Sequence, residues 1–162
     1  MVNQNQSNSE TIEVNMGEFA SASDGEILLT DGLGPCIGLA IHDPETSKGY
    51  LAHSFGLSMY EIEQAANQAT AESADPSKLN AWLSGGAITE PTKEDIESTK
   101  EHRKNTVDYL VRTGFMREQI QLSWTDSDAV SKMELRTVTG DCDIESFEEA
   151  DIFKDDYSDF DY

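Results

Sequence analysis

Short runs in which apolar and polar residues alternate recur along the chain, and only two stretches have helical spacing. Alternation with a period of two is typical of strands that are buried on one face. It predicts strands at 11–16, 26–30, 36–42, 50–55, 79–84, 119–124 and 133–138. Helices are predicted at 58–74 and 92–113, the first beginning with a capping box between Ser58 and Glu61. This order favours a single α+β domain, a mixed sheet or sandwich flanked by two main helices, over a parallel βαβ array.

The charge of the chain limits its partners. There are 32 acidic and 11 basic residues, which gives a net charge of −21 at pH 7. A surface of this sign repels phosphates, so it argues against binding to nucleic acid or to anionic lipid. Residues 141–162 contribute −9 and residues 11–140 contribute −11, so the body is acidic without its tail. An acidic body favours a halophilic, salt-adapted protein, because salt shortens the range of charge repulsion. Mimicry of nucleic acid is the rival hypothesis, and an ordinary acidic protein is the remaining alternative.

The termini and the cysteines predict a reduced, cytoplasmic protein. The first ten residues have no basic region and no apolar region of a signal peptide, and no run is long enough to span a bilayer. Two cysteines, Cys36 and Cys142, do not make a disulfide framework, and the histidines are too scattered for a metal site. His42 is expected to be structural, and His102, in the charged half of its helix, is expected to face solvent. We expect a disordered segment over 1–10, a domain over 11–140 and a flexible acidic tail over 141–162.

One segment has the pattern of a cysteine nucleophile. Cys36 follows a glycine-rich turn, in which the amides of Gly32 and Gly34 are candidate donors for an oxyanion and for substrate binding. A cysteine needs a neighbouring base, and the predicted hairpin brings His53 beside it. Thr30 is placed to fix the tautomer of that histidine. The alternative is that the cysteine is a small buried apolar residue and the histidine a core residue with satisfied hydrogen bonds.

The same residues carry a resemblance to the CheD family, the chemoreceptor glutamine deamidases. That family has a T-x-G-L-G-S-C-V element, a strand that ends in Asp-Pro, and a later G-x-x-H element. The matching positions are Thr30, Gly32, Leu33, Gly34, Cys36, Asp43, Pro44 and His53. Weaker likenesses lie at 16–20, 84–87 and 103–114, so the resemblance extends over about residues 14–140.

The resemblance implies a cysteine hydrolase fold and a protein-glutamine deamidase. Cys36 would attack the side-chain amide of a receptor glutamine, and His53 would take the thiol proton and give one to the departing ammonia. Thr30 would orient His53, and neither a cofactor nor a metal would be needed. The implied partners are the cytoplasmic helices of a chemoreceptor (a methyl-accepting chemotaxis protein) and a CheC-type phosphatase.

Two departures from the family pattern favour a second hypothesis. Pro35 replaces the serine before the cysteine and has no N–H to offer an oxyanion. The late G-G-x-x-G-R element is missing, and residues 124–129 take its place. The alternative function is therefore an adaptor, weakly active or inactive, that keeps the fold and binds a chemoreceptor or a CheC-type phosphatase. A third hypothesis, an acidic decoy for a protein that binds nucleic acid, rests on charge alone.

Overall fold

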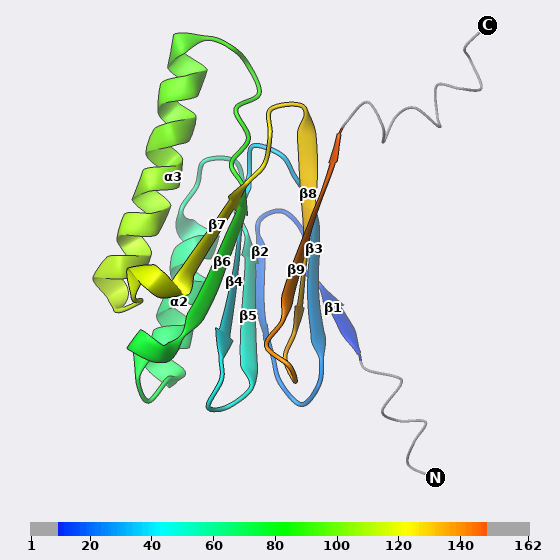
Figure 1. Cartoon of the computed structure of the whole chain (residues 1–162), viewed down its shortest axis with the longest axis vertical. Helices are drawn as coiled ribbons and strands as arrows, with labels where there is room; N and C mark the ends of the chain where they lie inside the picture. The colour runs from blue at the N-terminus through cyan, green and yellow to red at the C-terminus, as the bar shows by residue number, and fades with distance from the viewer. Residues whose placement is uncertain (1–9, 149–162) are drawn as a thin grey trace, which may run out of the picture.

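The computed structural model describes residues 10–148, in which two β-sheets and two helices are stacked in three layers. Figure 1 shows the sheets face to face, with both helices on the outer side of the second sheet. The expected disordered segment at the N-terminus lies almost wholly outside the described residues, as does the acidic tail beyond 148. The predicted α+β class, with mixed sheets and two main helices, is confirmed.

The first sheet has the strand order β1-β3-β8-β9. Its strands are β1 (Thr11–Glu13), β3 (Ile27–Leu33), β8 (Ala129–Arg136) and β9 (Cys142–Glu148). β1 and β3 are parallel, and the other neighbours are antiparallel. The register of β3 against β8 shifts between Thr30 and Leu33, so the backbone is irregular where β3 approaches the glycine-rich turn.

The second sheet has the order β2-β5-β4-β6-β7. Its strands are β2 (Glu18–Ala22), β4 (Ile37–Asp43), β5 (Lys48–His53), β6 (Asn80–Gly85) and β7 (Ile120–Trp124). β4 and β5 form the predicted hairpin, and β4 lies at the centre of the sheet, buried along its whole length. Because both faces of β4 are covered, the residues at its start are held on a rigid element.

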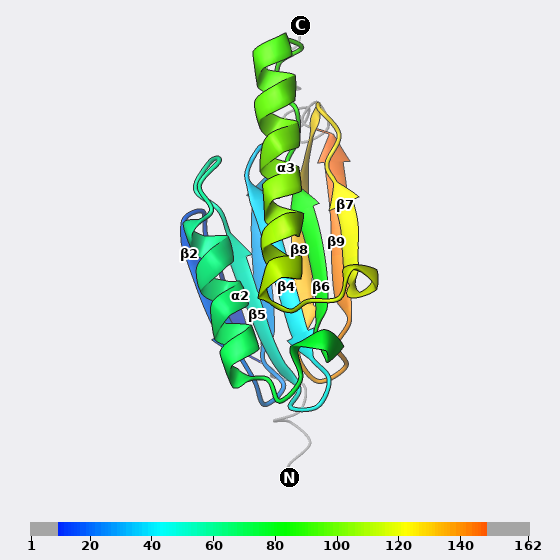
Figure 2. The ribbon, with the colours of Figure 1, turned by 90° about the vertical axis from the view of Figure 1, so that its left-hand side faces the viewer.

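Two helices cover the outer face of the second sheet (Figure 2). They are α2 (Tyr60–Glu72) and α3 (Lys93–Thr113), with short 3₁₀ turns η1 (Pro76–Lys78) and η2 (Arg117–Gln119) beside them. Thr92 caps α3 by accepting a hydrogen bond from the Asp95 amide, and Gly114 ends the helix in the left-handed region. Neither helix of the described range combines the length and the apolar character required to cross a lipid bilayer.

The hydrophobic core has two parts because β4 is apolar on both faces. Ile37, Leu39 and Ile41 face the helices. Cys36 and Ala40 face the first sheet, in a second cluster. Between them Gly38 leaves room for the opposing sheet, since a Cβ there would lie 2.7 Å from Leu33 Cδ1 and 2.8 Å from Met133 Sδ. The face that carries Cys36 therefore lies between the two sheets.

The predicted domain boundary at residue 140 is wrong. Residues 142–148 form β9 and pair with β8, although they belong to the segment expected to be a flexible tail. Cys142 and Ile144 alternate with acidic residues and pack against the inter-sheet cluster. Edge pairing with β8 and these two apolar contacts keep the acidic segment in the sheet.

Two predictions about the helices are also wrong. Ser58 and Glu61 form no capping box, because the first cap is Met59 and the Glu61 carboxylate accepts the Phe55 amide instead, at 3.1 Å. His102 is only 4% exposed rather than solvated. It is buried together with Thr99 and Thr106, which lie three residues before and four after it and so share the inward side of α3. The position of His102 on the inward side of the helix therefore decides its burial, although many of its neighbours in the sequence are charged.

Candidate active site

The loop that carries Cys36 is held in place by the end of β6. The Gly86 amide donates to the Cys36 carbonyl at 3.0 Å, and the Ala87 amide donates to the Gly34 carbonyl at 2.9 Å. Gly85 has a φ of +83°, and the site of a Cβ there overlaps the Cys36 carbonyl oxygen. Only glycine permits this close backbone approach. The Cys36 loop is thus fixed by residues about fifty positions later in the chain.

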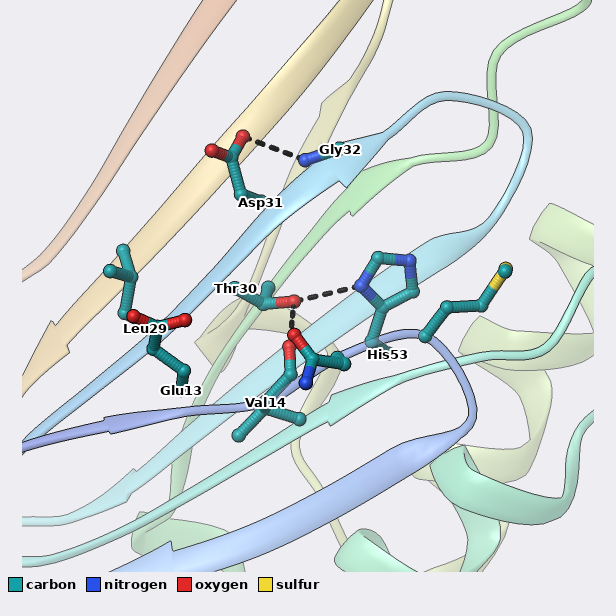
Figure 3. Close-up of a pocket in the computed structure, with 9 residues that line it drawn as sticks. Glu13, Val14, Leu29, Thr30, Asp31, Gly32 and His53 are labelled. Atoms are coloured by element: carbon teal, nitrogen blue, oxygen red, sulfur yellow. Dashed lines mark hydrogen bonds between the residues drawn. The ribbon is translucent and has the colours of Figure 1, made fainter.

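A chain of hydrogen bonds fixes the tautomer of His53. The Thr30 hydroxyl donates its single proton to the Val14 carbonyl oxygen, at 2.5 Å. It is also 2.8 Å from His53 Nδ1, so Nδ1–H must be the donor of that bond. Figure 3 shows Thr30 between the Val14 carbonyl and the imidazole ring. His53 Nε2 therefore carries the lone pair of the neutral ring, and this buried atom has no hydrogen-bond partner among the described residues.

Cys36 and His53 lie at the same end of the β4–β5 hairpin. His53 is paired directly with Gly38. Cys36 stands two positions before Gly38, in the bend that precedes β4, and packs in the cluster between the two sheets. The hairpin therefore brings the backbone of Cys36 close to that of His53, without a hydrogen bond between the two side chains among the described residues.

Burial keeps His53 neutral. The side chain is 3% exposed, and removal from water lowers its pKa below 6.5. The carboxylates of Glu61 and Asp31 act in the opposite direction, with a smaller effect. A neutral imidazole with a free Nε2 at neutral pH is the form that accepts a proton from a nucleophile.

The glycine-rich turn offers fewer free amides than its sequence implies. The Gly32 amide donates to its neighbour, Asp31 Oδ1, at 2.7 Å, and the Gly34 amide donates to the Gly32 carbonyl at 3.1 Å. Pro35 has no N–H. The Cys36 amide donates no hydrogen bond within residues 10–148, so it is the free donor in this turn. The two glycines shape the loop, and their expected role as direct donors to substrate requires the turn to rearrange.

A pocket of about 290 Å³ opens beside His53. Its lining comes from the β1–β2 connection, from β1, β3 and the end of β5: Glu13, Val14, Asn15, Met16, Leu29, Thr30, Asp31, Gly32 and His53. Figure 3 shows Glu13, Asp31 and the His53 ring around this space. The pocket reaches the buried histidine and Met16, whereas Cys36 is not among its lining residues.

Several supporting residues were not predicted to act at the site, although Arg103 lies in the weakly matching segment 103–114. Ser54 holds the start of β4, since its hydroxyl accepts the Ile37 amide at 2.9 Å. Thr125 accepts the Gly85 amide at 3.0 Å and bonds Ser131 on the opposite sheet, also at 3.0 Å. Arg103 donates to the Gly86 carbonyl at 2.8 Å. The hydroxyl residues in apolar strands were the available signal, because a buried hydroxyl needs a partner.

The other two histidines lie outside this arrangement. His42 is buried, and its Nε2 bonds the Thr137 carbonyl at 2.8 Å, which is a structural contact between the sheets. His102 Nε2 has no partner among the described residues, and burial lowers its pKa. The described residues contain no group of three or more His, Cys, Asp or Glu side chains that could hold a metal ion.

Met16 covers the cysteine. Its sulfur lies 3.6 Å from Cys36 Sγ, while the rest of the side chain is 54% exposed. The turn that presents it is fixed by the Gly17 amide, which donates to the His53 carbonyl at 2.8 Å. Cys36 is only 7% exposed beneath this cover. A substrate that reaches Sγ must therefore displace the methionine side chain.

We expect Met16→Ala to raise the rate at which iodoacetamide alkylates Cys36 by about 3- to 10-fold, because removal of a thioether cover exposes the sulfur. Peptide mapping by mass spectrometry separates this thiol from Cys142, and Met16→Leu is the matched control that keeps the bulk. Equal rates in wild type and Met16→Ala would show that the methionine does not limit access.

The fold and the site define a class: a two-sheet α+β protein with a buried cysteine and an oriented histidine on one hairpin. A relative, "Probable chemoreceptor glutamine deamidase CheD 3" of Geobacter sulfurreducens, is 30% identical over 150 residues, which cover 82% of this chain and 91% of the relative. "Probable chemoreceptor glutamine deamidase CheD" of Haloarcula marismortui is 31% identical over 91 residues, 56% of this chain and 53% of that protein. The chain belongs to the CheD family.

Other comparisons bear on the fold. No model of a protein family matches the chain. The crystal structure of a Bacillus licheniformis hypothetical protein, YfiH, aligns with a TM-score of 0.52 and 14% identity, over 65% of this chain and 49% of YfiH. The chain thus spans about half of that structure, and the likeness concerns the layered fold alone.

Proposed function

We propose that this protein hydrolyses the side-chain amide of glutamines on the cytoplasmic helices of a chemoreceptor, converting them to glutamate. The observation that carries the proposal is the unpartnered Nε2 of His53. The Thr30–Val14 chain orients this atom, and Cys36 stands two positions before Gly38, the residue paired with His53. Membership of the CheD family supplies the substrate class, since its relatives bear the name chemoreceptor glutamine deamidase.

The first half of the reaction releases ammonia. His53 Nε2 takes the Cys36 thiol proton while the sulfur attacks the carbonyl carbon of the glutamine side chain. The Cys36 amide is the free donor placed to bind the oxyanion that forms. His53 then gives its proton to the nitrogen, the carbon–nitrogen bond breaks, and a thioester on Cys36 remains. Nδ1–H stays bonded to Thr30 throughout, which stabilises the imidazolium.

The second half restores the cysteine. A water molecule gives a proton to His53 Nε2 and attacks the thioester carbon. The carbon–sulfur bond breaks, glutamate leaves, and the thiolate of Cys36 recovers its proton from His53. Together the two halves convert glutamine and water to glutamate and ammonia. Cys36 and His53 return to their starting states, and no redox partner is needed.

A second candidate function is a CheD-like adaptor that binds a chemoreceptor or a CheC-type phosphatase with little turnover. Its support is the occupied amides of Gly32 and Gly34 together with Pro35, which leave the turn with one free donor. Loss of one oxyanion donor costs about 10²–10³ in rate in other hydrolases. Both functions place the protein in the cytoplasm, where these partners lie.

The test is incubation of the full chain with the cytoplasmic fragment of a chemoreceptor, followed by peptide mass spectrometry. We expect a gain of about one dalton at specific glutamines, the change that amide hydrolysis produces, and release of ammonia in equal amount. Cys142→Ser is the matched control, because it removes the other thiol and is expected to retain the activity. Saturable receptor binding without conversion would favour the adaptor instead.

A further inference from the structure

The pocket beside His53 carries a charge that the proposed reaction does not require. Glu13 and Asp31 are exposed carboxylates on its lining, and its nine lining residues include no lysine and no arginine. The glutamine side chain is neutral, so the charge of these carboxylates would act on substrate residues next to the glutamine. The pocket is more than a patch of acidic surface, because the His53 side chain on its wall is 97% buried and its Nε2 is unpartnered.

The two carboxylates line the pocket beside Thr30. Glu13 pairs with Leu29, directly before Thr30 in β3, and Asp31 follows Thr30 directly. Both therefore stand next to the residue that holds His53 Nδ1. Asp31 Oδ1 accepts the Gly32 amide, so the orientation of this carboxylate is set by the turn itself. A cationic residue near the target glutamine would meet two negative charges on this lining.

We propose that this pocket selects glutamines accompanied by a lysine or arginine about one helical turn away, with Asp31 and Glu13 as the specificity-determining residues. Residues three or four positions apart share one face of a helix, so such a cation enters beside the glutamine. The inference rests on the proposed deamidase function and adds the charge of the preferred substrate. Each exposed pair is worth about a 2- to 5-fold preference.

The first experiment uses two helical peptides of receptor type, identical except for Lys or Glu four residues from one glutamine. We expect wild type to have the higher kcat/KM for the Lys peptide, and the ratio to fall about 2- to 5-fold in Asp31→Asn and again in Asp31→Asn/Glu13→Gln. Asparagine keeps the oxygen that accepts the Gly32 amide. Measurement above pH 7.5 keeps His53 neutral in every variant, because its pKa lies below 6.5.

The matched control is Asp24→Asn. Asp24 is exposed, lies before the opposite end of β3, and has a positive φ that asparagine tolerates. It removes one charge from a chain with a net charge of −21 without altering the pocket. A peptide ratio that falls equally in Asp24→Asn and Asp31→Asn would assign the preference to the overall charge and overturn the proposal.

A second measurement tests the inference without requiring that any substrate is converted. In a Cys142→Ser background, Cys36 is labelled with a cationic and with an anionic methanethiosulfonate reagent, and the ratio of the two rates is taken. Cys36 does not line the pocket itself, but Met16 lies over its sulfur and lines the pocket, so the reagent approaches Cys36 beside this lining. We expect this ratio to favour the cation and to fall about 2- to 5-fold in Asp31→Asn but not in Asp24→Asn. If no peptide is converted, the proposed function fails while this ratio still tests the pocket. An unchanged ratio in Asp31→Asn would overturn the inference alone.

Discussion

Replacement of His53 with glutamine is expected to lower the rate of glutamine deamidation by about 10²–10⁴-fold, the usual contribution of a general base. Glutamine fills similar space and still offers an N–H toward Thr30, but it cannot accept the thiol proton. The protein should therefore remain folded, with an unchanged circular dichroism spectrum, while turnover is lost. The measurement is the initial rate of ammonia release from a receptor fragment.

Two substitutions of Thr30, the hydrogen-bond partner of His53, provide controls that differ in severity. Thr30→Val removes the hydroxyl that receives Nδ1–H, so the ring loses its fixed tautomer, whereas Thr30→Ser keeps the hydroxyl. We expect the valine variant to lose activity and the serine variant to retain most of it. Burial lowers the His53 pKa, so kcat/KM should fall only as the pH drops below 6.5, where the histidine takes up a proton. A near-normal rate in His53→Gln, or an acidic midpoint above pH 6.5, would contradict the role of this base.

The largest effect on stability is expected from Gly85→Ala. The added methyl group would overlap the Cys36 carbonyl oxygen, and the φ of +83° is strained for any side chain. Overpacking costs about 1–3 kcal/mol and the left-handed conformation about 1–2, so unfolding free energy should fall by roughly 2–5 kcal/mol. Relief of the overlap requires the Gly86–Cys36 hydrogen bond to open, which displaces Cys36.

The matched control is Gly32→Ala, in the other glycine turn of the site. Gly32 has a φ of +70°, but a Cβ there meets no atom within 4 Å. It should therefore cost only the conformational strain of about 1–2 kcal/mol. Urea denaturation followed by tryptophan fluorescence compares the two. Equal losses would mean that close approach to Cys36 adds nothing at Gly85.

The proximity of Cys36 and His53 in the chain fold was predictable from the sequence, because a hairpin brings its two strands side by side. The register, in which Gly38 faces His53, was not predictable, since a slip of one residue would turn every side chain to the other face. The structure packs Cys36 between the sheets and brings Thr30 within hydrogen-bond distance of the histidine. The roles assigned to these three residues stay predictions, as does the salt-adapted interpretation of the charge.

The parts that sequence patterns missed depend on contacts distant in the chain. Nothing in the pattern around Gly85 indicates that it packs against the Cys36 carbonyl, and nothing near Met16 places its sulfur on the thiol. The burial of His102 depends on which side of α3 meets the sheet. The acidic sequence of β9 predicts a solvated tail, but pairing with β8 holds the strand in the sheet. Local propensity gives way to tertiary packing at each of these positions.

The most direct test of the central claim is the mass of the enzyme trapped during turnover. The full chain is mixed with excess receptor peptide, quenched in acid within the first turnover, and digested for mass spectrometry. Our account predicts an adduct on the peptide that contains Cys36, equal in mass to the substrate less ammonia and removed by hydroxylamine as a thioester would be. Conversion of glutamine without any adduct on Cys36, and at the same rate in Cys36→Ala, would contradict it.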